Sequence, residues 1–134
     1  DSGTTDTYWN RAISTAFQTA FQQMAGRAHS NTAVSLTEAE LLALPTILFQ
    51  LYADPGANPD MDPQKGLGLA GYLDPAHPAD VMLAFPPSHY MEYDADTGKY
   101  TSRFYATESG GSVLGANAMM GHDILFDSDN DRIG

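Results

Sequence analysis

The spacing of apolar residues predicts one long helix near the start of the chain. Between residues 8 and 24 the apolar side chains recur at spacings of three, four and five positions, which fits the period of about 3.6 residues of an α-helix. Serine, threonine and glutamine occupy the opposite face. Asn10 is suited to cap the start of this helix and Gly26 to end it. We therefore expect a helix over 8–24 whose apolar stripe packs in the core.

The next segments predict a short helix and then a buried strand. Thr37 and Glu40 have the spacing of a capping box, in which each side chain accepts a hydrogen bond from the main chain of the other residue. Pro45 would end this helix. The segment TILFQLY, residues 46–52, is rich in β-branched and aromatic residues, which are typical of strands.

The stretch 53–80 changes character, because five prolines and several glycines interrupt it. Proline lacks a main-chain donor and glycine costs conformational entropy, so neither favours a regular element. We expect 53–80 to be a long surface loop or insertion.

Short strands dominate the rest of the chain. The segment VMLAF (81–85) is followed by HYMEY (89–93) and KYTSRFY (99–105), which DADTG would join into a hairpin with Gly98 in the turn. A further strand pattern, HDILFD, leads into a polar turn at 127–131. One long and one short helix among many short strands predict a mainly β domain over 1–134.

The composition of the chain argues against several classes of binding partner. The chain has 17 acidic and 6 basic residues and a net charge of −11, which argues against nucleic acid and against anionic membrane surfaces. No cysteine is present, so neither a disulfide nor a thiolate metal site can form within the chain.

The acidic and histidine residues do not show the spacing of a metal site. Asp127, Asp129 and Asp131 alternate as at the start of an EF-hand loop, but Arg132 stands where that loop requires glycine. The four histidines show no metalloprotease spacing. We expect no metal and no organic cofactor.

Two motifs far apart in the sequence point to a shared chemistry. The chain begins Asp1-Ser2-Gly3-Thr4, and Val113-Leu114-Gly115 lies near its end. Between and after them, in order, stand LPTILFQL (44–51), PPSHYM (86–91) and FDSDNDRIG (126–134). This ordered set resembles the C-terminal lobe of the pepsin-like aspartic proteases. Each half of these bilobal acid proteases carries one D-[ST]-G-[ST] turn and, downstream, a hydrophobic-hydrophobic-glycine strand.

The resemblance implies an aspartic endopeptidase that cuts a polypeptide substrate. Asp1 would be one catalytic carboxylate, and an N-terminal lobe of the same protein would supply the second. Two carboxylates at close range share one proton, so one can activate water while the other donates a proton to the scissile carbonyl. Ser2, Gly3 and Thr4 would support the Asp1 carboxylate, Thr5 would border the substrate cleft, and the strand 113–115 would lie beneath the turn.

The chain also departs from the family. The usual disulfide of this lobe has no cysteines here, and YWNR stands at 8–11 where the family commonly has a proline near the start of its helix. Only one D-S-G-T motif is present, so we expect the chain to be a piece of a longer protein. A secreted or endolysosomal (vacuolar) location, with any membrane anchor outside this chain, follows only from the resemblance.

Two alternatives remain open at this point. A protease-like binding or inhibitor protein would keep the fold but lack the second aspartate. A self-assembling single lobe would contribute one aspartate from each of two copies. The sequence upstream of Asp1 and the mass of the protein in solution distinguish these alternatives from an endopeptidase.

Overall fold

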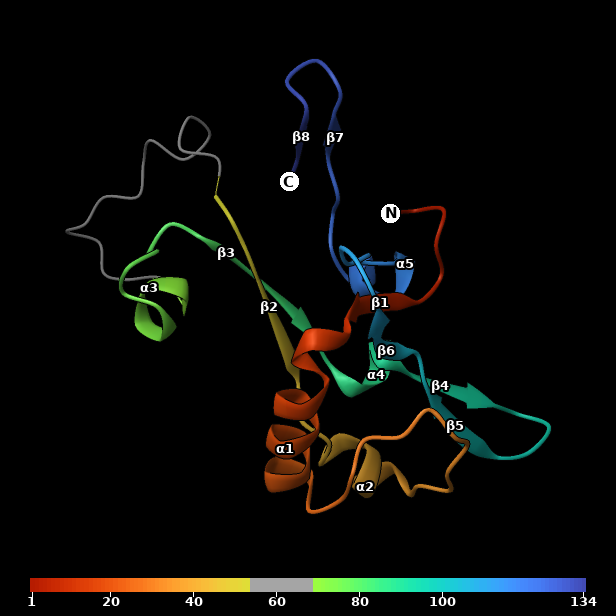
Figure 1. Cartoon of the computed structure of the whole chain (residues 1–134). Helices are drawn as coiled ribbons and strands as arrows, with labels where there is room; N and C mark the ends of the chain where they lie inside the picture. The colour runs from red at the N-terminus through yellow and green to blue at the C-terminus, as the bar shows by residue number, and fades with distance from the viewer. Residues whose placement is uncertain (54–68) are drawn as a thin grey trace. The chain divides into compact units, whose positions relative to one another are not determined.

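The computed structural model describes residues 1–53 and 69–134, which divide into two compact units, one of residues 1–45 and 86–134 and one of residues 46–85. Helix and strand occur in about equal amounts, and each sheet has two strands, so the described chain is mixed rather than mainly β (Figure 1). Several short helices are present in addition to the two that were expected. Short apolar runs between turns, such as Ala116–Met119, form single helical turns that periodicity does not detect.

The first unit contains most of the regular elements. Its strands are β1 Thr7–Asn10, β4 Met91–Asp94, β5 Lys99–Ser102, β6 Phe104–Glu108, β7 Phe126–Asp127 and β8 Arg132–Ile133. Its helices are the 3₁₀ turn η1 Arg11–Ile13, α1 Ser14–Ala25, α2 Glu38–Leu42, α4 Pro87–Tyr90 and α5 Ala116–Met119.

The expected helix over 8–24 is only partly correct. Residues 7–10 form strand β1, because the aromatic residues Tyr8 and Trp9 suit an extended chain that pairs in parallel with β6. The predicted cap at Asn10 is confirmed: its side chain accepts a hydrogen bond from the N–H of Ala12 at 2.9 Å and starts η1. The predicted end is confirmed as well, since Gly26 is left-handed with φ 68°.

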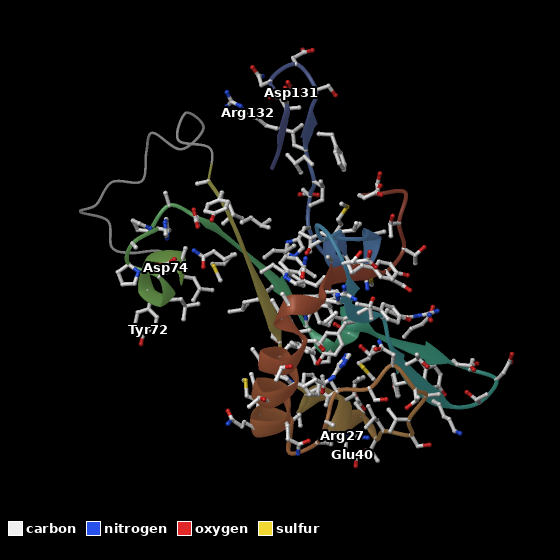
Figure 2. All side chains as sticks on the ribbon, viewed as in Figure 1. Arg27, Glu40, Tyr72, Asp74, Asp131 and Arg132 are labelled. Carbon is white, nitrogen blue, oxygen red and sulfur yellow. The ribbon has the colours of Figure 1, made fainter. Side chains whose placement is uncertain are left out.

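The other local predictions in this unit are correct only in part. Of HDILFD only 126–127 is strand, and KYTSRFY is divided at Arg103 between β5 and β6, the second of which pairs with β1. The capping box of Thr37 and Glu40 is present at the start of α2. The hairpin of β4 and β5 is present with Gly98 at φ 64°, although His89 and Tyr90 belong to α4 instead of the strand. The polar turn joins β7 to β8, with Asp131 at φ 53° near the end of this hairpin (Figure 2).

The core of the first unit lies between α1, β6 and the segment around α4. Phe104 and Tyr90 are completely buried, and the Tyr90 hydroxyl donates to the carbonyl oxygen of Pro45 at 2.8 Å. Burial raises the pKa of Tyr90, so this phenol stays protonated as a donor. Phe17 on α1 packs against Phe104 with ring centroids 4.8 Å apart.

The second unit is built on one antiparallel pair. The predicted strands at 46–52 and 81–85 are present as β2 Ile47–Leu51 and β3 Val81–Phe85. They pair along their whole length around the buried rings of Phe49 and Phe85, a pairing that was not predicted. Helix α3 Leu69–Leu73 lies within the stretch expected to lack regular structure, so that part of the expectation is wrong. Its apolar run contains no proline and is long enough for one helical turn. Residues 54–68 of that stretch lie outside the described residues.

No helix in the parts of the chain described here has the length and apolar character needed to cross a membrane.

Candidate active site

The first four residues form a turn around the Asp1 carboxylate. The N–H of Gly3 donates to Asp1 Oδ1 at 2.9 Å, and the Thr4 hydroxyl donates to Asp1 Oδ2 at 2.8 Å. Gly3 and Thr4 are two of the three residues expected to support this carboxylate. A Cβ on Gly3 would lie 3.2 Å from Asp1 Oδ1, which is tighter than most real contacts. Each carboxylate oxygen therefore has its own donor, and the orientation of the exposed Asp1 side chain is fixed on both sides.

The turn is bonded to the segment 113–115, but the expected strand there is not formed. Val113 makes an isolated antiparallel bridge with Tyr8, and Leu114 and Gly115 belong to no strand. The Asp1 nitrogen donates to the carbonyl oxygen of Leu114 at 2.6 Å. On the other side of the turn, the N–H of Ala116 donates to the carbonyl oxygen of Thr4 at 2.7 Å. A reciprocal pair of main-chain bonds, at 2.9 and 2.7 Å, links Tyr8 to Val113. The turn is thus fixed in place by a segment more than 100 residues away in the sequence.

Gly115 stands where no other residue fits. A Cβ at this position would lie 2.1 Å from the carbonyl oxygen of Asp6 and 2.9 Å from that of Thr4, both main-chain atoms. The N–H of Gly115 also donates to the Thr7 hydroxyl at 3.2 Å. The glycine of the Val-Leu-Gly pattern therefore allows the two backbones to approach each other.

A buried polar network lies next to the turn. The completely buried Thr7 donates its hydroxyl hydrogen to Asn117 Oδ1 at 2.8 Å, and Asn117 Nδ2 donates to the carbonyl oxygen of Arg103 at 3.2 Å. Buried polar groups are stable when they are hydrogen-bonded in this way. Thr7 and Asn117 were not expected from the sequence to belong to the site, since no motif in the chain distinguishes them.

Charged side chains flank this network. Arg103 forms an ion pair with Glu92, and its Nη1 lies 3.8 Å from Asp6 Oδ2. The sequence analysis assigned no site role to these three residues. The nearest acidic neighbour of the Asp1 turn in sequence, Asp6, thus has a basic partner.

Ser2 and Thr5 have fewer contacts than Thr4. Ser2 is exposed. Thr5 is exposed, and its carbonyl oxygen accepts a hydrogen bond from the N–H of Asn117 at 3.1 Å. Thr5 also borders a mostly apolar cavity of about 570 Å³, together with Met91 and Met120.

Among residues 1–53 and 69–134, no three histidine or acidic side chains are grouped in a way that could hold a metal ion. The three aspartates at 127–131 lie in the hairpin of β7 and β8, where Asn130 Nδ2 donates to Asp127 Oδ2 at 2.7 Å.

No protein-family model matches the chain, and a search of curated proteins finds no match.

Proposed function

We propose that this chain is one lobe of an aspartic endopeptidase, in which Asp1 is one of two catalytic carboxylates. The second would come from an N-terminal lobe that this chain does not include. The substrate would be an extended polypeptide, and no metal or organic cofactor is required by this chemistry.

The observation that carries the proposal is the support of the Asp1 carboxylate. Hydrogen bonds from Gly3 and Thr4 alone would be those of an ordinary turn in which an aspartate caps its own neighbours. Here the turn is also bonded at both of its ends to a distant segment, by Asp1 to Leu114 and by Thr4 to Ala116, next to a glycine that the close approach requires. An exposed carboxylate does not need such a rigid base for stability, but a catalytic group that must be positioned to a fraction of an ångström does.

The proposed mechanism follows from pairing this carboxylate with another. Two carboxylates within a few ångströms do not both ionise easily, so the pair holds one proton and titrates as a unit. The ionised member takes a proton from a water molecule as the water oxygen attacks the scissile carbonyl carbon. The protonated member gives its proton to the carbonyl oxygen. Collapse of the tetrahedral intermediate, with proton transfer to the nitrogen, releases the amine and the new carboxyl terminus.

The experiment uses the protein that contains this chain together with its preceding lobe. Peptide hydrolysis is measured between pH 3 and 6, with and without the transition-state analogue pepstatin. Asp1→Asn should lower kcat at least ~100-fold, since removing a general acid or base costs about 10²–10⁴. The matched control is Asp6→Asn, which removes a nearby carboxylate with an Arg103 partner and should leave kcat within a few-fold.

Three outcomes would contradict the proposal. Absence of hydrolysis when both aspartates are present would refute it. Tight peptide binding without cleavage would indicate a protease-like binding protein. Activity of this chain alone, with the mass of a dimer in solution, would indicate a self-assembling single lobe.

A further inference from the structure

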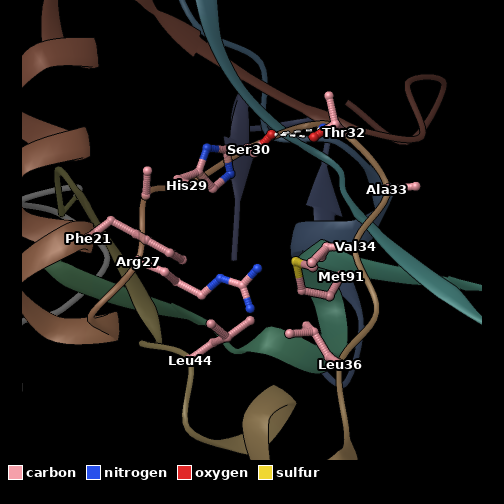
Figure 3. Close-up of a pocket in the computed structure, with 11 residues that line it drawn as sticks. Phe21, Arg27, His29, Ser30, Thr32, Ala33, Val34, Leu36, Leu44 and Met91 are labelled. Carbon is pink, nitrogen blue, oxygen red and sulfur yellow. Dashed lines mark hydrogen bonds between the residues drawn. The ribbon is translucent and has the colours of Figure 1, made fainter.

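A cavity of about 150 Å³ lies in the first unit, and none of the residues that line it belongs to the Asp1 turn or to the segment 113–115. Its walls come from α1, the segment 27–36, Leu44 and β4 (Figure 3). Phe21, Leu44 and Met91 are buried side chains of this wall, and Val34 and Leu36 continue it. These five side chains form an apolar side of the cavity, and polar groups line the rest.

One cation points into this apolar surrounding. Arg27 follows Gly26, the left-handed residue that ends α1, and its guanidinium extends into the middle of the lining side chains, between Leu44 and Met91 (Figure 3). Within the described ranges, no hydrogen bond to its guanidinium is found and no acidic group lies within 4 Å of it. Arg27 is an exposed residue that also lines the cavity, so a ligand from solvent can reach it.

The acidic side chain near Arg27 is that of Glu40, and it is hydrogen-bonded to another residue. Glu40 lies close to Arg27 (Figure 2), but its Oε2 accepts hydrogen bonds from the N–H and the hydroxyl of Thr37, at 2.7 and 2.8 Å. These two bonds are the main reason that the pKa of Glu40 is lowered, and the charge of Arg27 contributes less. Glu40 thus completes the capping box of α2 with Thr37, and the guanidinium keeps its donors for another anion.

The other polar groups of the cavity do not compete for that role. The hydroxyls of Ser30 and Thr32 bond to each other at 2.7 Å (Figure 3). His29 Nε2 is bonded to Ser102 Oγ at 2.7 Å. A guanidinium presents a planar fork of donors that matches a carboxylate, and apolar walls beside it favour a ligand with an apolar body. A volume of about 150 Å³ is sufficient for a benzene-sized group.

We propose that this cavity binds a small apolar monocarboxylate of about the size of benzoate. Its carboxylate pairs with Arg27, and its ring or branched body packs against Phe21, Leu44 and Met91. This site is separate from the proposed peptidase chemistry and does not depend on it.

The test titrates the full chain with benzoate at pH 7, followed by amide shifts in NMR spectra. Benzoate should shift the resonances of Phe21, Val34 and Met91 with one saturating curve. Acetate, which lacks the ring, and benzyl alcohol, which lacks the charge, should each bind at least tenfold more weakly. This comparison needs no variant, so it stands even if a substitution perturbs folding.

Variants then test whether Arg27 is the residue that binds the benzoate carboxylate. Arg27→Met should weaken benzoate at least tenfold and make benzoate and benzyl alcohol equal. The matched control Arg11→Met removes an exposed arginine outside the cavity and should change neither ligand. Equal binding of benzoate and benzyl alcohol to the unaltered chain, shifts elsewhere in the chain, or full benzoate binding by Arg27→Met would overturn the proposal.

Discussion

Acid should destabilise the first unit in part through the partly buried histidine His29. Its ring lies among three phenylalanine rings, with centroid distances of 5.1 Å to Phe17, 5.3 Å to Phe21 and 6.0 Å to Phe104. The polar contact of Nε2 is the hydroxyl of Ser102. Burial lowers the pKa of His29 from 6.5 to about 4, because the charged ring would lose hydration that these neighbours do not replace.

The direction and size of the effect follow from proton linkage. The unfolded chain takes up the proton near pH 6.5, whereas the folded chain takes it up only near pH 4. Between these values the unfolded state holds more protons, so the free energy of unfolding falls as pH falls and the loss is complete below pH 4. The pKa difference corresponds to about 3 kcal/mol at 1.36 kcal/mol per pH unit. Since His29 is only partly buried, solvent screening reduces the expected loss to about 2 kcal/mol.

The assay is urea unfolding, followed by circular dichroism, at several values between pH 7 and pH 4. Other groups also titrate in this range, so the informative quantity is the difference between the unaltered chain and His29→Gln, whose amide can still bond to Ser102. The variant should lose about 2 kcal/mol less between pH 7 and pH 4. The control is His77→Gln. His77 is exposed, and a hydrogen bond and charge from Asp74 raise its pKa, so its protonation affects stability in the opposite direction to that of His29. Equal losses for His29→Gln and the unaltered chain would refute the reasoning.

Three further substitutions test the base of the site and the first unit by thermal unfolding. Gly115→Ala should cost about 3 kcal/mol or prevent folding, because its Cβ would lie 2.1 Å from a main-chain oxygen, whereas Gly110→Ala meets nothing within 4 Å and should cost under ~1 kcal/mol. Thr7→Val should cost about 2 kcal/mol, because it leaves the buried groups that it bonds without a partner, while Thr5→Val at an exposed position should change stability by under ~0.5 kcal/mol. Thr37→Ala should cost about 1 kcal/mol through loss of the capping box of α2. A neutral Gly115→Ala or Thr7→Val would contradict the close approach or the buried network, respectively.

Local chemistry was predictable where one residue decides the structure. Asn10, Gly26 and Gly98 each fix a cap or a turn by their own side chain or by its absence, and all three act as expected. The start of the long helix was less predictable. Tyr8 fits an apolar helical stripe, but its main chain bonds to Val113, a partner that periodicity cannot foresee. Tertiary pairing thus decided between strand and helix.

The candidate site shows the same division between local and distant causes. The turn at Asp1 could be predicted because Gly3 and Thr4 are its neighbours in sequence. The contribution of Asn117 could not, because its partner Thr7 lies 110 residues away and neither residue type signals a buried bond.

The placement of glycine at 115 connects these two kinds of information. In the sequence it is only the last letter of a short apolar pattern, and its backbone conformation is one that any residue can adopt. Its necessity comes from two carbonyl oxygens, of Thr4 and Asp6, which leave no space for a side chain. Such a contact constrains both segments at once, since any shift of residues 4–6 toward solvent would make room at 115 and loosen the Asp1 turn. The pairing of a D-S-G-T turn with a distant glycine is therefore a physical requirement of this packing. A substitution at Gly115 should alter the Asp1 turn, and a substitution within residues 4–6 should alter the packing at Gly115.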